Sequence, residues 1–310
     1  MLSERRSEMQ TALIKCAIAP LYQNPEHRMA SIDEVLYGMK VELLEERGEW
    51  WYVRTHYRYE GYLHRHNLLF QSSKICTWEQ AERGIIIKNH VDILAAPSYQ
   101  AYRLACLPKG AQIIRLEQPD EDGFVKVGLV DGRIGFLRKC WLKAYVKSIY
   151  EDEYEKLRKM TARLKEEPKF LPSVYIDRIL GKNEQEFRDS IIKTALSYLG
   201  TSYRWGGKTT LGIDCSGLCQ MAYLLNGLII YRDSCIQDDF PIRKISLQQK
   251  KPGDLLFAPG HVAIYLGEEQ YIHSTGKNGR DGVVIESLDP CKENYREDLA
   301  TSFDIAGTVF

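Results

Sequence analysis

The chain has 310 residues, 42 Lys and Arg against 42 Asp and Glu, and 44% apolar residues. These values are typical of a globular protein with enough chain for two or three cores, and the balanced charge argues against a surface that binds nucleic acid. The longest mostly apolar run, residues 221–231, is far shorter than the ~20 residues of a membrane-spanning helix. The sequence therefore predicts no nucleic-acid partner and no membrane partner.

The N-terminus and the cysteines bear on the cellular compartment. Glu4, Glu8 and Lys15 interrupt the apolar core that a secretory signal peptide needs. The eight cysteines are scattered along the chain, which favours reduced thiols, most of them small buried residues, over a disulfide framework. We therefore expect a cytoplasmic protein.

Two stretches in the first half of the chain look like copies of one pattern. Equivalent residues are 72 positions apart at Gly38 and Gly110, and 74 apart further on, at Val53 and Val127. A loop two residues longer in the second copy reconciles the two. Short alternating strands rich in Val, Ile, Tyr and Trp, separated by Gly and Asp turns, are typical of a small closed β-barrel.

Each copy ends in G-[YF]-L, and this ending together with the spacing resembles the bacterial SH3-like fold. We assign residues 1–75 and 76–146 to two all-β SH3-like barrels. In residues 147–187 the apolar side chains fall near helical spacing until Pro168 stops the pattern, so this segment is predicted to be a helical linker.

Residues 188–310 form the third predicted domain, in which helices combine with an antiparallel sheet as an α+β fold. The expected elements are a helix over 186–199, a Gly-rich turn, a helix after Asp214, and strands over 254–258, 261–266 and 271–275.

Cys215 lies in this domain where a nucleophile could be activated. Apolar residues at 218, 221, 222 and 225 predict a helix that begins near Asp214, a good N-cap. The N–H groups and dipole of a helix start favour an anion, so we predict that Cys215 is a nucleophile with a lowered pKa. The competing interpretation, one more small buried residue, suits Cys219 one turn later.

Two histidines on the following strands could complete the site. A thiolate needs an imidazole base, and that imidazole needs a third group that fixes its tautomer. His261 suits the base and His273 the third group, whereas the other five histidines lie in polar barrel segments where we expect solvent. Because these two residues are twelve apart, a hairpin loop with an odd residue count, or a bulge, would place both side chains on one face.

A metal site made of Cys215, Cys219, His261 and His273 is a weaker alternative. The spacing of these residues lacks the close ligand pairs that are typical of zinc sites. No cofactor is expected.

Three blocks follow one another in the third domain: YLGTSYRWGG with GIDCSGL, then KPGDLLFAPGHVAIYLG, then YIHST. Together they resemble the NlpC family of papain-like cell-wall cysteine peptidases. The resemblance implies that Cys215, His261 and His273 are a catalytic triad and that Tyr203 helps the Cys215 N–H hold the oxyanion. For Trp205, substrate binding and plain core packing both stay open.

The segment YRDSCIQ, residues 231–237, narrows the resemblance. With two SH3-like domains and a helical linker, it resembles the γ-D-glutamyl-L-diamino-acid endopeptidases, also called dipeptidyl-peptidase VI, which act on murein peptides with a free N-terminal L-alanine. The resemblance implies a substrate groove lined by Asp214, Ser216, Arg232, Asp233 and Ser234, with Asp233 available to the alanine ammonium. From the residues alone, a loop turn is the stronger interpretation of Asp233 and Ser234.

The first barrel departs from this group at one position. The group uses an acidic residue in an LYGE-like segment and a tyrosine before the last strand of the barrel. Here the segment is LYGM, with Met39 in place of the acid, and Tyr59 is the expected tyrosine, although Tyr57 or Tyr62 fits nearly as well. Either Asp233 alone supports the ammonium, or the protein accepts a different N-terminal residue.

The resulting hypothesis is a cysteine endopeptidase that hydrolyses the bond between γ-D-glutamate and diaminopimelate or lysine in short murein peptides, during peptidoglycan recycling. A murein peptide is then the expected partner, and the oligomeric state is left open. The alternatives are a non-catalytic protein that binds cell-wall peptide, and a papain-like amidase or acyltransferase on the same fold.

Overall fold

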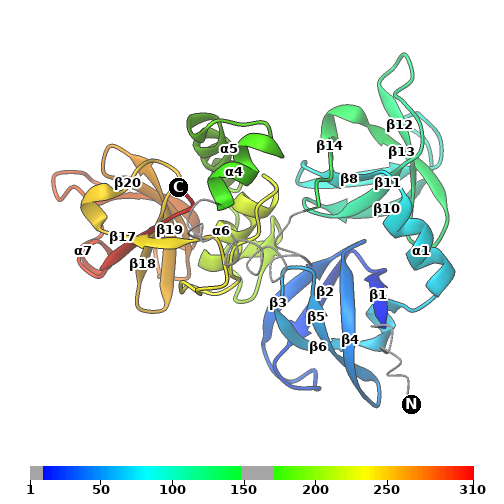
Figure 1. The fold of residues 1–310 in the computed structure, drawn as a ribbon, viewed down its shortest axis with the longest axis horizontal. Coiled ribbons are helices and arrows are strands. Elements are labelled where there is room, and N and C mark those ends of the chain that lie inside the picture. The colour runs from blue at the N-terminus through cyan, green and yellow to red at the C-terminus, as the bar shows by residue number, and fades with distance from the viewer. Residues whose placement is uncertain (1–9, 148–170) are drawn as a thin grey trace, which may run out of the picture. The chain divides into compact units, whose positions relative to one another are not determined.

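A computed structural model describes residues 10–147 and 171–310 of the chain (Figure 1). The chain divides into two compact units, Met1–Tyr145 and Val146–Phe310. The helical pattern expected before Pro168 lies outside the described residues. Within the described ranges, no helix is long and apolar enough to cross a membrane.

The first unit contains two seven-stranded antiparallel sheets. The strands of the first sheet are β1 Thr11–Ile14, β2 Ile18–Tyr22, β3 Ser31–Leu36, β4 Lys40–Arg47, β5 Trp50–Thr55, β6 Glu60–His64 and β7 Leu68–Leu69. Those of the second are β8 Arg83–Ile86, β9 His90–Leu94, β10 Arg103–Pro108, β11 Gln112–Arg115, β12 Phe124–Gly128, β13 Ile134–Arg138 and β14 Leu142–Ala144.

The two sheets share one strand order. The first runs β3-β2-β6-β5-β4-β1-β7 and the second β10-β9-β13-β12-β11-β8-β14, so each strand has a counterpart seven strands later. In both sheets the glycine of the repeated G-[YF]-L ending lies where a neighbouring side chain leaves no room for a Cβ. A Cβ on Gly61 would lie 2.8 Å from the Leu21 side chain, and one on Gly135 would lie 2.5 Å from Ile93. The sequence repeat therefore corresponds to a repeat in strand order and in strand packing.

A helix that the sequence pattern does not predict connects the two sheets. Helix α1, Ser72–Gln80, buries Trp78 in a core that also contains Tyr37 from the first half and Val130 from the second. The Tyr37 hydroxyl accepts a hydrogen bond from the Val130 N–H at 2.8 Å. The expected boundary between residues 75 and 76 lies inside this helix, because the apolar face of α1 contributes to the shared core.

The second unit combines helices with a six-stranded antiparallel sheet and a two-stranded one. Its elements are α4 Leu171–Arg178, α5 Glu184–Leu196, β15 Lys208–Thr209, β16 Gly212–Ile213, α6 Cys215–Leu224, β17 Arg243–Ile245, β18 Leu255–Ala258, β19 His261–Gly267, β20 Gln270–Thr275, β21 Gly282–Ser287, α7 Glu297–Ala300 and β22 Ile305–Thr308. The larger sheet is ordered β17-β22-β18-β19-β20-β21. This is the mixture of helices and antiparallel strands expected from the sequence.

Helix α6 is held in place by packing on both α5 and the larger sheet. It contacts α5, β19 and β20, and the Tyr223 hydroxyl donates a hydrogen bond to the Gly253 carbonyl at 2.7 Å. Arg188 of α5 is buried and donates to Asp254 at 2.8 Å and to Thr308 at 3.2 Å. The start of α6 is therefore fixed relative to the strands that follow it.

Two expectations about burial are wrong. All eight cysteines lie in the described ranges as free thiols, but only Cys215 and Cys219 are buried; five are exposed, namely Cys76, Cys106, Cys140, Cys235 and Cys291. The exposed thiols lie in loops or on outward faces of their elements. His56 is buried although we expect it to be solvated, because its ring packs edge-on against Tyr57 in the turn after β5.

Candidate active site

The first turn of α6 begins at Asp214, as predicted. The Asp214 Oδ1 accepts a hydrogen bond from the Gly217 N–H at 2.6 Å, which is the geometry of an N-cap. Its Oδ2 accepts one from the Gly206 N–H at 2.8 Å. Asp214 thus joins the Gly-rich turn to the helix start, and Cys215 is the first residue of the helix.

Arg232 holds the same carboxylate from the opposite side. Its guanidinium donates to both Asp214 oxygens, at 3.1 and 3.0 Å, and to the Ser216 Oγ at 2.8 Å. Arg232 is only 1% exposed. The charged groups of Arg232 and Asp214 are thus bonded to one another at the helix start, where they position Cys215 and Ser216. Their expected contact with substrate stays a prediction.

The expected lowered pKa of Cys215 is also wrong for this arrangement. Burial raises the pKa of the Cys215 thiol to about 11, and the negative charge of Asp214 acts in the same direction. The N–H groups of Val262 and Ser216 and the charge of Arg232 offset this only in part. The helix start supplies the expected N–H donors, but enclosure of the sulfur outweighs them. Enclosure of the sulfur thus favours the neutral thiol in the resting site.

The two histidines lie on one face of the sheet, as predicted. Ile264 of β19 pairs with Ile272 of β20, and a bulge follows Tyr265, which satisfies the condition on the hairpin. In this register His261 and His273 are diagonal neighbours. The Nε2 of His261 is 2.7 Å from the Nδ1 of His273, with ring centroids 4.9 Å apart. The adjacent Val262 N–H faces the Cys215 sulfur, so the histidine pair begins beside the thiol.

Glu286 is a site residue that the sequence pattern does not reveal. On β21, Val284 pairs with His273 and Glu286 with Tyr271, so the Glu286 side chain lies on the same face as His273, one diagonal further on. Its Oε2 is 2.8 Å from the His273 Nε2, and the residue is fully buried. The only local signal is a carboxylate directly after the apolar stretch GVVI, and the strand register is needed to interpret it.

The three groups have coupled charge states. Burial lowers the pKa of His261 to about 3, and the neighbouring His273 and Arg296 act in the same direction. Burial also lowers the pKa of His273, against the opposing effect of Glu286. Burial acts to raise the pKa of Glu286, but the hydrogen bond and charge of His273, together with Arg296 and Tyr271, lower it overall. Burial thus favours the neutral form of both imidazoles, whereas the groups around Glu286 favour its carboxylate form.

Tyr203 and Trp205 precede the thiol in the Gly-rich turn. Burial raises the pKa of Tyr203 to about 12, and the neighbouring Cys215 and Asp214 act in the same direction, so its hydroxyl stays a hydrogen-bond donor near the sulfur. Its backbone bridges to Ile213, immediately before the helix. Trp205 is 64% exposed, which excludes the core-packing interpretation.

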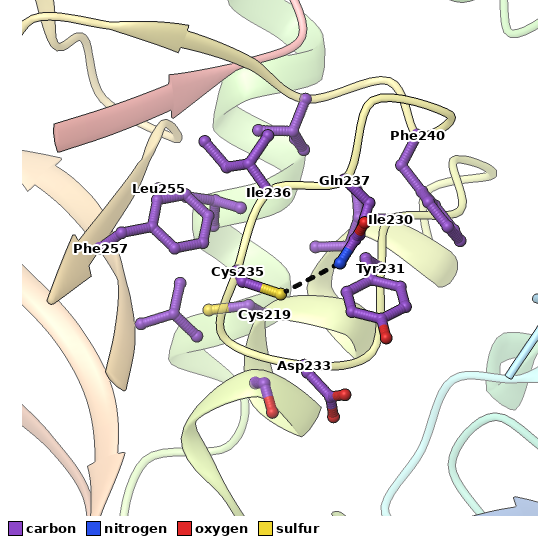
Figure 2. A pocket seen from close by; sticks show the side chains of 13 residues that line it. Cys219, Ile230, Tyr231, Asp233, Cys235, Ile236, Gln237, Phe240, Leu255 and Phe257 are labelled. Atoms are coloured by element: carbon purple, nitrogen blue, oxygen red, sulfur yellow. Dashed lines mark hydrogen bonds between the residues drawn. The ribbon is translucent and has the colours of Figure 1, made fainter. Parts of the chain in front are cut away.

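A small pocket adjoins the start of α6 (Figure 2). Ser216 and Asp233 line it together with mostly apolar side chains from loop 230–242 and from β18 and β19. Tyr231, also in its wall, donates a side-chain hydrogen bond to Asp233, and burial followed by the Asp233 charge raises the pKa of Tyr231 to about 12. Ser234 is half-buried beside Asp233. The structure thus brings Ser216 and Asp233 to one pocket, and Arg232 is bonded to Ser216.

The residues expected from the first barrel lie in the other unit. Met39 is fully buried, and its sulfur accepts a hydrogen bond from the Leu36 N–H at 3.4 Å. Tyr59 is half-buried, and its N–H donates to the Thr55 hydroxyl at 2.9 Å, in the turn between β5 and β6. Acid and tyrosine side chains do meet elsewhere in this sheet. The Tyr57 hydroxyl donates to the Asp33 Oδ2 at 2.5 Å, and the Tyr52 hydroxyl donates to the Glu60 Oε2 at 2.9 Å.

The weaker alternative that the sequence offers is a metal site made of Cys215, Cys219, His261 and His273. Within residues 10–147 and 171–310, no group of three or more His, Cys, Asp or Glu side chains could hold a metal ion.

Comparison with known proteins identifies the class. The NlpC/P60 family matches residues 200–299, and the bacterial SH3 domain matches residues 19–68. A relative with 39% identity over 302 residues covers 96% of this chain and 99% of its own length. The chain belongs to the NlpC/P60 family, and it is a peptidoglycan-hydrolysing peptidase.

That relative is the Dipeptidyl-peptidase 6 of Lysinibacillus sphaericus. The Gamma-D-glutamyl-L-lysine dipeptidyl-peptidase of Bacillus subtilis is 37% identical over 119 residues, which are 36% of this chain and 38% of the relative. Among solved structures, an NlpC/P60 family protein from Bacillus cereus superimposes with a TM-score of 0.70 at 19% identity, over 96% of this chain and 98% of that one. The last likeness shows the fold alone.

Proposed function

We propose that this protein is a cysteine endopeptidase that hydrolyses the bond between γ-D-glutamate and diaminopimelate or lysine in short murein peptides with a free N-terminal L-alanine. One observation carries the proposal: the Cys215 sulfur faces the Val262 N–H, and the His261–His273 pair begins at the next residue. The names and identities of the two dipeptidyl-peptidase relatives support the choice of bond.

The proposed mechanism starts from a neutral thiol and a neutral imidazole. As the Cys215 sulfur attacks the carbonyl carbon, its proton passes to His261, so the ion pair forms during attack. The Cys215 N–H and the Tyr203 hydroxyl stabilise the oxyanion. His261 then protonates the leaving amine of the diamino acid, and water activated by the same imidazole hydrolyses the acyl-enzyme. His273 orients His261 throughout.

Substrate recognition is proposed for the pocket beside the thiol. Ser216, Asp233 and Ser234 lie at this pocket or next to it, and the exposed ring of Trp205 could cover a bound peptide from the Gly-rich turn. Arg232 supports these residues from below through its bonds to Ser216 and the N-cap.

For the substrate ammonium we propose Asp233, without an acidic residue at position 39. The Asp233 carboxylate lines the same pocket as Ser216 and already accepts a hydrogen bond from the Tyr231 hydroxyl. A carboxylate of this kind suits a cationic ligand. The expected role of Tyr59 stays a prediction.

The domain organisation belongs to the same proposal. Residues 1–75 and 76–146 would be two SH3-like domains, supported by their common strand order. Residues 188–310 would be the peptidase domain, joined through 147–187. A role in the recycling of murein peptides in the cytoplasm is supported by the eight free thiols, which suit a reducing compartment.

The test is cleavage of L-Ala-γ-D-Glu-diaminopimelate followed by mass spectrometry. Wild type should release L-Ala-D-Glu, Cys215→Ala should release none, and Cys219→Ala, which removes the other buried thiol of α6, should remain active. The proposal is wrong if wild type yields no product or if Cys215→Ala cleaves equally well. Binding without cleavage would favour the non-catalytic alternative, and products that carry a transferred acyl group would favour the acyltransferase.

A further inference from the structure

Three adjacent strands place three titratable side chains in a diagonal line across one face of the sheet. His261 on β19, His273 on β20 and Glu286 on β21 are each one diagonal step from the next. The His261 Nε2 is 2.7 Å from the His273 Nδ1, and the His273 Nε2 is 2.8 Å from the Glu286 Oε2. Each histidine therefore uses a defined ring nitrogen toward its neighbour, and the line ends on a carboxylate that is fully buried.

We propose that Glu286 is a positioning residue that sets the tautomer of both histidines, so that His261 presents an unprotonated Nδ1 to Cys215. This inference rests on the proposed roles of Cys215 and His261 in the cysteine peptidase. Glu286 thus acts on the reacting thiol indirectly, through the imidazole rings of His273 and His261.

The proton positions follow from what each group can donate. An ionised carboxylate only accepts hydrogen bonds, so the His273 Nε2 next to Glu286 must carry the proton. A neutral imidazole carries one proton, so the His273 Nδ1 is an acceptor, and the His261 Nε2 that faces it must carry its own proton. The remaining nitrogen, the His261 Nδ1, is then free to accept the proton of the Cys215 thiol. If Glu286 were protonated, it could donate instead, and both rings could adopt the opposite tautomer.

The surroundings of Glu286 maintain its charge. The Tyr271 hydroxyl donates to Oε2 at 3.2 Å, an Arg296 nitrogen lies 3.6 Å from the same oxygen, and Arg280 lies 3.8 Å from Oε1. Asp298 faces Arg296 at 2.9 Å and balances part of that positive charge. Two guanidinium groups and a hydroxyl thus face one buried carboxylate, which is a setting that keeps it ionised.

The same arrangement stabilises the charge that forms during attack. The S–H bond of Cys215 breaks as its proton binds the His261 Nδ1, and the resulting imidazolium keeps its Nε2 proton toward His273. The positive charge is then separated from the Glu286 carboxylate by one neutral ring. No proton has to reach Glu286 for this stabilisation.

The first test is the tautomeric state of wild type. In the full-length protein labelled with ¹⁵N-histidine, long-range ¹H–¹⁵N correlation spectra at neutral pH should show both His261 and His273 protonated on Nε2. A His273 ring protonated on Nδ1 would overturn the proposal. Because this measurement needs no substrate, it separates a failure of the inference from a failure of the proposed activity.

The second test is Glu286→Gln, which keeps the shape but lets the side chain donate as well as accept. We expect kcat for the murein peptide to fall about 10- to 100-fold, as for the loss of other partners that orient a functional histidine. KM should stay unchanged, and the spectrum should gain the opposite tautomer.

Asp254→Asn is the matched control, because it neutralises another buried carboxylate of the same unit, bonded to Arg188. It should lower stability without changing the tautomers or kcat. A Glu286→Gln protein with wild-type tautomers and wild-type kcat would refute the role; if that variant does not fold, the wild-type spectrum alone decides.

Discussion

Both carboxylate oxygens of Asp214 accept hydrogen bonds from the guanidinium of Arg232, at 3.1 and 3.0 Å, while their backbone donors are Gly217 and Gly206. Asp214 therefore caps α6, anchors the Gly-rich turn and neutralises a buried arginine at once. The residue next to it is the thiol, so the position of Cys215 depends on this ion pair.

Removing the guanidinium should destabilise the second unit. In Arg232→Gln the Asp214 carboxylate stays buried without its counter-charge, and the expected loss is about 3 kcal/mol of the free energy of unfolding. Denaturant unfolding followed by circular dichroism measures it. Lys251→Gln breaks an ion pair with Glu184 on the surface, where Lys251 is 62% exposed, and should cost under ~1 kcal/mol. Equal losses in the two variants would contradict the role of Arg232.

The reactivity of Cys215 should rise with pH across the neutral range. Since the pKa of the thiol is raised to about 11, the thiolate fraction, and with it the rate of alkylation by iodoacetamide, should increase about tenfold per pH unit between pH 6 and 9. Peptide mapping by mass spectrometry separates Cys215 from the exposed thiols, with Cys215→Ala as the blank. A rate that is already constant below pH 7 would indicate a preformed ion pair and the low pKa expected from the helix start alone.

Acid should destabilise the protein partly through the two histidines. The pKa of His261 is about 3 in the folded protein against an ordinary 6.5, so the unfolded chain binds more protons between these values. Stability attributable to His261 is present above pH 6.5 and is lost as pH falls toward 3. The loss of Tm between pH 7 and pH 4 should therefore be smaller in His261→Gln than in wild type. The exposed His66→Gln variant should follow wild type; an identical loss in His261→Gln would refute the coupling.

Recognition of the substrate ammonium should depend on Asp233. Asp233→Asn removes the charge and should raise KM for the free-amine peptide about tenfold or more, as expected for a charged hydrogen bond of about 1.5–3 kcal/mol. Met39→Leu conserves volume at a fully buried position and should leave KM unchanged. Steady-state kinetics with free and N-acetylated peptide measure both effects. An unchanged KM in Asp233→Asn would exclude this carboxylate from the binding site.

The features that the sequence predicts correctly depend on near neighbours along the chain. The Asp214 cap and the start of α6 follow from helical periodicity and a capping residue. The repeat follows from the spacing of glycines and of the G-[YF]-L ending, which can be seen in the sequence alone. Helix α1 escapes prediction because its buried residues pack against parts of both sheets that are remote in sequence.

The sequence by itself thus determined the class of protein, the nucleophile candidate and the two histidines, because spacing and local motifs carry that information. Only the tertiary structure decided that Glu286 lies behind His273, since antiparallel register selects which residues share a face. Only the tertiary structure turned Arg232 inward and raised the pKa of Cys215. The pKa of a buried group depends on all the groups that surround it, and the fold brings these together from distant positions in the sequence. The start of a helix is only one of them.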